Sequence, residues 1–411
     1  MTATKIKSTA SKDQEVREEF KKTKLKDLCI IKGDYGINAA AVEFSPDLPA
    51  YLRITDLGDN NQLDLSKKKS VHEEDYKNFI LGHNEIVFAR TGGTVGKSYL
   101  HDQSKYGIYV FAGFLIRFKT DENLLLPKYL KLYTETSEYW NWVKVMSVRS
   151  GQPGINSKEY SSLLIPLPPL PEQKKIADIL STWDKAIETT QALIQKLQLR
   201  KKGLMQQLLT GKKRLPGFSR EWEVVQFKDI IKERSEYPDG DLPLYSLTIQ
   251  DGVTPKTERY ERSFLLTTTV KAYKKMCTND FALNPMNLRF GAIAKHSGDL
   301  DVCVSKYYNI FYCLDDFNST YFEYYLQSNP MIQYYNKMAI GSLEEKKRVH
   351  FSDFIKFKKQ LPSFKEQTAI AQVLTKTDDG INQTQNYLKQ LQEQKKGLMQ
   401  QLLTGQRRVA V

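Results

Sequence analysis

The chain contains the same long segment twice. Residues 172–214 align without a gap onto residues 366–408, at a constant offset of 194 positions (366 − 172), and about half of the paired residues are identical. Residues 201–211 and residues 395–405 share the run KKGLMQQLLTG. This period is far longer than the units of about 20–50 residues that build solenoids. The sequence therefore predicts a duplication of whole modules.

The duplication extends to the beginning of each half. Glu19-Phe20 is echoed by Glu221-Trp222, at an offset of 202 (221 − 19), so the second copy lacks a net eight residues (202 − 194) between the two matched regions. The halves differ in that intervening region. Similar flanking segments around a dissimilar intervening region indicate one scaffold that carries two different recognition surfaces.

Each repeated segment has the pattern of a long amphipathic helix. Apolar positions recur in alternating steps of four and three residues, which is the pattern of a helix-pairing seam. The proposed seam residues are Ile176, Leu180, Trp183, Ile187 and Leu197 in the first copy and Ile370, Leu374, Ile381, Leu388 and Leu391 in the second. The proline-rich run at 166–171 should precede the first helix, which is expected to begin at Glu172, and Gly211 and Gly405 should end the two helices.

The two helices are expected to pair antiparallel, because a globular module lies between them in the chain. Two alternatives stay open, namely that each helix packs on its own globular domain or that the seam forms a homodimer. The predicted organisation has four parts: a globular domain at residues 1–170, a long helix at 171–213, a second globular domain at 214–362 and a second long helix at 363–411.

Composition narrows the classes of partner. A chain of 411 residues exceeds one compact core, and a net charge of +13 favours an anionic partner such as nucleic acid or an anionic membrane surface. No apolar stretch approaches the roughly 20 residues that span a bilayer, so a cytoplasmic protein without a membrane partner is expected. The four cysteines and five histidines are scattered without metal-ligand spacing, and no metal site is predicted.

Several enzyme signatures fail in this chain. Residues 90–98 read RTGGTVGKS, but a phosphate-binding P-loop requires glycine where Thr91 stands. Residues 284–287 read NPMN and lack the second proline and the aromatic residue of the tetrapeptide found in amino-methyltransferases. Asp47 and Asp239 each follow a proline, but neither has the acidic-x-lysine partner of the common nuclease core. The chain is therefore predicted to have no catalytic residues.

Taken together, these segments resemble the specificity (S) subunits of type I restriction-modification systems, from about residue 19 to residue 408. The residues that carry the resemblance are NEIVFARTGGTVGK at 84–97, SGQPGIN at 150–156, IPLP at 165–168 with Glu172-Gln173, and the repeated GLMQQLLTG.

The resemblance implies a mixed α/β architecture of two target-recognition domains, separated by two long antiparallel helices that form a coiled coil with pseudo-twofold symmetry. In that family each domain reads one half of a bipartite double-stranded DNA site. The helices bind two methyltransferase (M) subunits, and restriction (R) subunits add cleavage. No cofactor is then expected in this chain, since S-adenosylmethionine, ATP and magnesium belong to the partner subunits.

Binding a duplex requires Lys and Arg for phosphates and a few rigidly held side chains for base edges. The DNA-binding residues proposed from sequence are Arg90, Lys97, Arg149 and Gln152 in the first domain and Asn287, Arg289, Lys295, Lys347 and Arg348 in the second. The run at 67–69 is a weaker, phosphate-facing candidate. The second domain departs from the motifs of the first at both loops, so its half-site is expected to be unrelated.

Two other classes of protein remain compatible with parts of the sequence. One is a catalytic DNA protein such as a fused methyltransferase or nuclease, which binding of S-adenosylmethionine by the isolated chain would reveal. The other is a coiled-coil DNA-binding scaffold or repressor outside restriction-modification, which its mass in solution and its DNA footprint would reveal.

Overall fold

The computed structural model describes residues 20–57, 63–238, 240–256 and 272–410. Glu19 and Asp239, which appear in the sequence arguments above, lie outside these residues. The chain divides into two compact units, called here unit 1 (residues 1–190 and 387–411) and unit 2 (residues 191–386). Each unit holds one globular part and a stretch of each of the two long helices, because both helices continue from one unit into the other.

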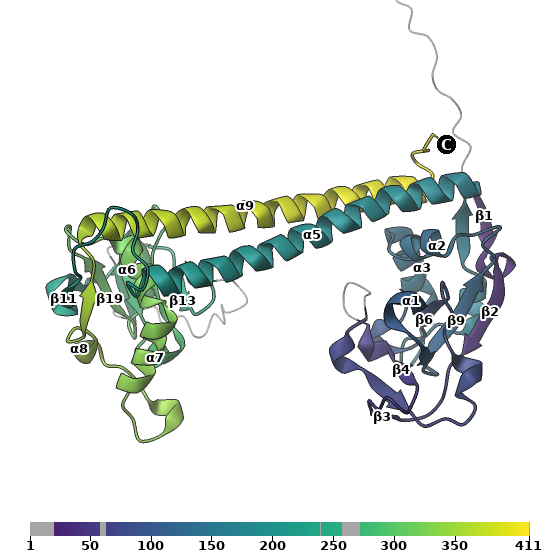
Figure 1. Ribbon diagram of the computed structural model, residues 1–411, viewed down its shortest axis with the longest axis horizontal. Helices are drawn as coiled ribbons and strands as arrows, with labels where there is room; N and C mark the ends of the chain where they lie inside the picture. Colours follow the sequence, from purple (N-terminus) through teal and green to yellow (C-terminus); the bar gives the residue numbers. More distant parts are fainter. Residues whose placement is uncertain (1–19, 58–62, 239, 257–271, 411) are drawn as a thin grey trace, which may run out of the picture. The chain divides into compact units, whose positions relative to one another are not determined.

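The globular part of unit 1 is built on two four-stranded sheets (Figure 1). One is antiparallel in the order β2-β9-β6-β7, and the other has the order β3-β5-β4-β8 with β4 and β8 parallel. A separate pair joins β1 to β10. The strand bounds are β1 Lys21–Lys24, β2 Cys29–Tyr35, β3 Ala41–Glu43, β4 Ala50–Leu52, β5 Lys69–Val71, β6 Ile86–Ala89, β7 Ser98–Leu100, β8 Tyr109–Phe111, β9 Leu115–Thr120 and β10 Leu164–Leu167.

Strand β6 explains how the first sheet is buried on both faces. All four of its residues are buried, and successive side chains point to opposite faces because the strand period is two residues. Ile86 and Phe88 join the large core that includes the helices, whereas Val87 and Ala89 join a second core that includes β4 and β8. A short continuous apolar run is therefore a central strand here.

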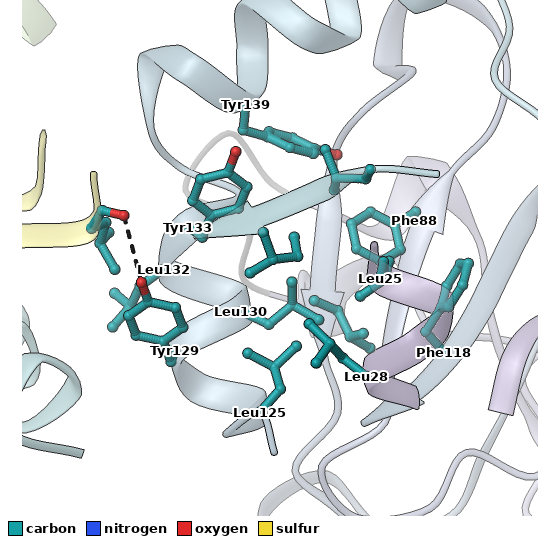
Figure 2. Close-up of a cluster of buried hydrophobic side chains, with 14 of the residues drawn as sticks. Leu25, Leu28, Phe88, Phe118, Leu125, Tyr129, Leu130, Leu132, Tyr133 and Tyr139 are labelled. Atoms are coloured by element: carbon teal, nitrogen blue, oxygen red, sulfur yellow. Dashed lines mark hydrogen bonds between the residues drawn. The ribbon is translucent and has the colours of Figure 1, made fainter. Parts of the chain in front are cut away.

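Helices cover the first of these faces. The helices on this face are α2 Pro127–Tyr133, α3 Ser137–Met146 and α4 Ser157–Ser161. Unit 1 also contains the short helix α1, Gln103–Tyr106, which is not part of this core. Figure 2 shows Leu130 of α2 on the side of Phe88 and Phe118 of the sheet, whereas Tyr129 points the other way, toward the end of α9; all of these residues belong to one core. The Tyr129 hydroxyl also lies 3.5 Å from the carbonyl oxygen of Leu403, so this core includes the end of the second long helix.

Unit 2 repeats the frame of unit 1. Its four-stranded sheet has the order β12-β19-β16-β17, which matches β2-β9-β6-β7, and the pair β11-β20 matches β1-β10. In place of the second sheet the described residues form two separate antiparallel pairs, the hairpin β13-β14 and the pair β15-β18. The bounds are β11 Glu223–Gln226, β12 Ile231–Arg234, β13 Tyr245–Thr248, β14 Gly252–Pro255, β15 Tyr273–Met276, β16 Phe281–Leu283, β17 Ile293–Lys295, β18 Val302–Ser305, β19 Asn309–Cys313, β20 Lys358–Leu361, α6 Ser319–Leu326, α7 Asn329–Met338 and α8 Phe351–Phe354.

The long helices are α5, Leu170–Leu208, and α9, Phe364–Leu403. In unit 1, Lys395 near the end of α9 pairs with Asp184 in the first half of α5, at 2.6 Å. In unit 2, Lys201 near the end of α5 pairs with Asp378 in the first half of α9, also at 2.6 Å. The helices are therefore antiparallel within each unit. The two pairs are equivalent under the sequence offset of 194 (395 − 201), which confirms the pseudo-twofold duplication.

The proposed seam residues are buried unevenly. In unit 1, Ile176 and Leu180 lie in one core with Leu402 of α9 and with the globular part. In unit 2, Ile370 and Leu374 share a core with Leu208 of α5. The apolar stripe thus contacts both the other helix and the globular domain. Ile381 and Leu391 are also buried, and the remaining seam residues are half-buried, namely Trp183, Ile187, Leu197 and Leu388.

The beginning of α5 differs from the expectation. The helix begins at Leu170 and includes Pro171, rather than starting at Glu172 after the proline run. Proline is tolerated in the first turn of a helix, because the amide hydrogen that it lacks would have no partner within the helix there. Gly211 and Gly405 follow the helices with φ of 71° and 79°, as helix-ending glycines commonly do. Among the described residues, no helix is long and apolar enough to cross a membrane.

Candidate nucleic-acid interface

The loop after β6 in unit 1 forms a turn of a β-hairpin. Residues 90–97 connect β6 to β7 through a short 3-10 helix, Gly92–Thr94, so the P-loop-like sequence leads into a strand and not into the N-terminus of a helix. A second loop, residues 147–156, lies against it. Gly92 N donates to Pro153 O at 3.0 Å, and Ile155 N donates to Arg90 O at 2.9 Å. Two motifs that are about 60 residues apart in the chain thereby form one surface.

Arg90 has a rigid setting on this surface. Its guanidinium lies over the ring of Tyr35, 4.8 Å from the centroid, and it donates to Gly113 O at 3.4 Å. The Tyr35 hydroxyl in turn accepts a hydrogen bond from Ser157 N. A stacked, half-buried guanidinium keeps donors available in a fixed plane, which suits bidentate contact with a guanine edge. The sequence analysis missed Tyr35, because only the pairing of β2 and β6 with β9 brings it near Arg90.

The other three candidates of unit 1 have different settings. The Gln152 side chain lies against Gly92, since a β-carbon added there would be 3.0 Å from Gln152 Nε2. Arg149 is held by both carboxylate oxygens of Glu159 at 2.6 Å, and this pair ties the loop to α4. Lys97 is half-buried at the end of the turn. The structure therefore places Arg90 and Gln152 on two loops that contact each other, and it places Arg149 in an intramolecular ion pair.

Unit 2 has the corresponding two loops with different residues. Val349 N donates to Pro285 O at 3.1 Å, and Val349 stands 194 positions (349 − 155) after Ile155, which makes the matching contact in unit 1. The loop at 340–348 is closed by a bridge between Ile340 and Arg348. Asn287 precedes the short 3-10 helix Leu288–Phe290 on the facing loop. Both Asn287 and Arg348 are exposed.

An acidic residue, also missed in the sequence, organises the basic side chains of unit 2. Glu344 forms ion pairs with Arg289 and with Lys347, the latter at 2.6 Å. Hydrogen bonds from Lys347 and Arg289 lower the pKa of the Glu344 carboxyl below its ordinary value. The Arg289 guanidinium also lies over the Phe290 ring at 4.5 Å. Four of the five proposed residues, Asn287, Arg289, Lys347 and Arg348, thus lie on these two adjacent loops.

Lys295 is placed apart from that group. Its Nζ donates to Thr320 Oγ1 at 2.8 Å on α6, and its backbone nitrogen donates to Glu323. Burial raises the pKa of the Glu323 carboxyl. The lysine run at 67–69 is also engaged: Lys67 pairs with Asp64, Lys68 lies over the Phe44 ring, and Lys69 pairs with Glu43.

Both loop pairs carry residue types that can contact anions and base edges. Each presents arginine beside an aromatic ring and an amide side chain nearby, Gln152 in unit 1 and Asn287 in unit 2. These residue types are the common readers of guanine and adenine edges. No group of His, Cys, Asp or Glu suited to hold a metal ion occurs in the part of the chain that the structure describes.

Comparison with known proteins agrees with these observations. The family model of the type I restriction modification DNA specificity domain matches residues 17–199. The type I restriction enzyme MjaVIII specificity subunit of Methanocaldococcus jannaschii is 26% identical over 361 residues, which cover 81% of each chain. The HsdS subunit from Thermoanaerobacter tengcongensis shares the fold, with a TM-score of 0.52, 15% identity and coverage of 94% of this chain and 97% of that one.

A further similar structure comes from work on complex assembly in the type I restriction-modification system, with a TM-score of 0.58, 14% identity and coverage of 95% of this chain and 98% of that one. Like these structures, the chain has long helices beside globular α/β parts, and its own two globular parts share one sheet order and differ in their loops. Residues 17–199 thus match the type I restriction modification DNA specificity domain, and the chain as a whole is similar to specificity subunits of type I restriction-modification systems.

Proposed function

We propose that this chain reads a bipartite DNA site, with the loops of unit 1 on one half-site and the loops of unit 2 on the other. The observation that carries this proposal is the contrast between a common sheet order and unlike loops. The sheets β2-β9-β6-β7 and β12-β19-β16-β17 are equivalent. The loops after β6 and β16 differ in sequence and place their arginines differently, Arg90 directly after β6 and Arg289 within the 3-10 helix Leu288–Phe290, so the two modules suit different sequences.

In the same proposal, the chain carries no catalytic residue. Two methyltransferase subunits bind the long helices and their flanking regions, and restriction subunits complete the assembly. S-adenosylmethionine, ATP and magnesium then act on those partner subunits. The amphipathic helices support this arrangement, since their outer faces bear many exposed glutamines, including Gln191, Gln195 and Gln198, that remain available for a protein partner.

Exchange of one globular part tests the division of labour. Replacing residues 30–163 with the equivalent segment of a relative leaves the β1–β10 pair and both long helices in place. We expect the methylated sequence to change in one half-site only, because each module carries its own base contacts. Methylome sequencing of cells that express the hybrid with its methyltransferase subunit measures this. A change in both half-sites would contradict the modular reading, and methyl transfer by the purified chain alone would contradict the non-catalytic role.

The stacked guanidinium of Arg90 gives a residue-level prediction. Arg90→Ala should weaken binding to the first half-site about tenfold or more, in line with the 1–3 kcal/mol typical of a bidentate base contact. Arg90→Lys keeps the charge but not the planar pair of donors, so it should be nearly as weak. Binding titrations against targets altered in either half-site would measure both. Near-native affinity of Arg90→Lys would mean that Arg90 contacts only phosphate.

A further inference from the structure

Unit 2 contains a cavity between its portion of α5 and the first turn of α7. The cavity has a volume of about 630 Å³. Met205 of α5 and Pro330 and Ile332 of α7 give it apolar walls, and Lys202 and Lys212 stand at its edge on the α5 side. None of the proposed DNA-binding residues lines it. The cavity is therefore distinct from the loop surface described above.

The cavity is electropositive. Lys201 also lines it, but Asp378 neutralises that lysine at 2.6 Å. Lys202 and Lys212 are exposed, and no carboxylate among the described residues forms an ion pair with either. No aspartate or glutamate lines the cavity. Two positive charges at the edge of a partly apolar recess favour an anionic group with an aliphatic stem.

The first turn of α7 adds donors that the chain does not use. Ser328 is the N-cap residue, its side chain makes no capping hydrogen bond, and the residue is only 4% exposed. Ser328 lines the cavity, its hydroxyl does not cap the helix, and that hydroxyl is not among the fully buried side-chain atoms that lack a partner. Buried polar groups are normally hydrogen-bonded, and the amides at the start of a helix attract negative charge. Ser328 is thus a nearly buried residue whose hydroxyl is left for a ligand in the cavity, beside the amides of the helix N-terminus.

Unit 1 has a smaller cavity of about 420 Å³ at the duplicated position, and Glu138 lines it. There the N-cap residue of α3, Thr136, accepts a hydrogen bond from Tyr139 N at 3.2 Å. Glu138, in the first turn of α3, forms an ion pair with Lys22 at 2.8 Å. Proline 330 stands at the corresponding place in α7, two residues after the N-cap. One copy supplies its own carboxylate at this helix end, and the other copy has none.

We propose that the cavity of unit 2 binds an acidic side chain of a methyltransferase subunit. The carboxylate accepts from the Ser328 hydroxyl and pairs with Lys202 or Lys212, while its aliphatic stem contacts Met205 and Ile332. A DNA phosphate fits less well, because the walls are partly apolar. The loop proposed to contact DNA also lies at the opposite, C-terminal end of α7, where Asn336 Nδ2 donates to Arg289 O at 2.9 Å. This inference rests on the proposed function, and it makes subunit binding unequal at the two modules.

Charge reversal at equivalent positions provides a matched test. Lys202 and Lys396 are both exposed lysines of the duplicated run, separated by 194 positions (396 − 202), and only Lys202 lines the cavity. The full-length chain is titrated with its cognate methyltransferase subunit, and native mass spectrometry counts the bound copies. We expect Lys202→Glu to weaken one of the two binding steps about tenfold or more, as truncation or reversal of an interfacial charge pair commonly does. Lys396→Glu should stay within about twofold of the native chain.

Ser328→Ala separates a binding role from a structural one. The hydroxyl does not cap the helix, so the variant should unfold at the same denaturant concentration as the native chain. It should nevertheless bind the methyltransferase subunit several-fold more weakly. Equal effects of Lys202→Glu and Lys396→Glu, or native binding by Lys202→Glu, would overturn the inference. Loss of DNA affinity with native subunit binding would assign the cavity to phosphate and overturn it too. A native chain that binds no methyltransferase subunit would instead reject the proposed function, and this inference with it.

Discussion

Replacing Arg408 with alanine is expected to lower the free energy of unfolding of unit 1 by about 3 kcal/mol, the lower end of the range for breaking a buried ion pair from one side. Arg408 Nε and a terminal nitrogen donate to the two carboxylate oxygens of Glu172 at 2.8 and 2.7 Å. The Glu172 side chain is 3% exposed, so the substitution leaves a buried charge without its partner. The lower end applies because the Arg408 side chain is 39% exposed and water can enter the vacated space.

Hydrogen exchange resolved along the chain is the suitable measurement, since a protein with two units does not unfold in one step. Protection should fall for the core amides of unit 1 and persist in unit 2. Arg407→Ala is the matched control, because Arg407 is an exposed neighbour of Arg408 and its substitution removes the same charge. Equal loss of protection in the two variants would show that the pair with Glu172 does not stabilise the unit.

The equivalent pair in unit 2 should give the mirror result. Arg214 donates to both oxygens of Glu366 at 2.6 Å, and Trp222 Nε1 adds a third donor at 3.2 Å. Glu172 likewise keeps a donor, Val409 N at 3.3 Å, so Arg214→Ala should cost about as much as Arg408→Ala, and its effect should be confined to unit 2. These two pairs explain why glutamate begins, and arginine ends, both copies of the repeated segment.

The sequence predicted the two long helices and the duplication well, because their signals lie in short stretches of sequence and occur in both copies. Heptad spacing and the helix-ending glycines indicated both long helices before any contact was known. The partners of the apolar stripe could not be predicted in the same way. Periodicity shows that Ile176 and Leu180 are buried, but it does not show that a globular core and a second helix share them.

The loop surfaces were predicted only as groups of residue types. Arg149 and Arg289 were proposed as DNA-binding residues on the same grounds as Arg90, yet Glu159 and Glu344 hold them in ion pairs. Those acids lie 10 and 55 positions away in the chain. Nothing in a single sequence specifies such pairings, since they depend on how two loops meet. Whether these arginines contact DNA stays a prediction.

Gln173, the second residue of the repeated Glu-Gln pair, fastens the beginning of α5 to the globular part of unit 1. It is fully buried, its Oε1 accepts from Leu126 N at 2.9 Å, and its Nε2 donates to Leu124 O and to Pro168 O, both at 2.9 Å. Gln173→Glu would remove both donated hydrogen bonds and place a carboxylate against two carbonyl oxygens. We expect a loss of about 4 kcal/mol at neutral pH, since each buried group left unsatisfied costs about 1–3 kcal/mol.

Acid should reverse part of this loss. Burial and the facing carbonyl oxygens favour the neutral carboxyl, so the pKa of the new glutamate in the folded chain is expected to lie above the unfolded value of about 4.3. The folded state then binds the proton more tightly, and the destabilisation grows as the pH rises above about 4.3 and shrinks as it falls. The protonated group can also donate one of the two missing hydrogen bonds.

The duplicated residue supplies the comparison. Gln367 accepts from Asn318 N at 2.9 Å and donates to one carbonyl oxygen, that of Pro362, at 2.8 Å. Gln367→Glu leaves one carbonyl unsatisfied where Gln173→Glu leaves two, so it should cost about half as much, and in unit 2 only. Gln191→Glu, at an exposed position of α5, serves as the control for added charge. Hydrogen exchange at pH 7 and near pH 5 measures all three variants. A loss in Gln173→Glu that equals the exposed control, or one that acid does not relieve, would mean that the buried amide does not hold the helix to its domain.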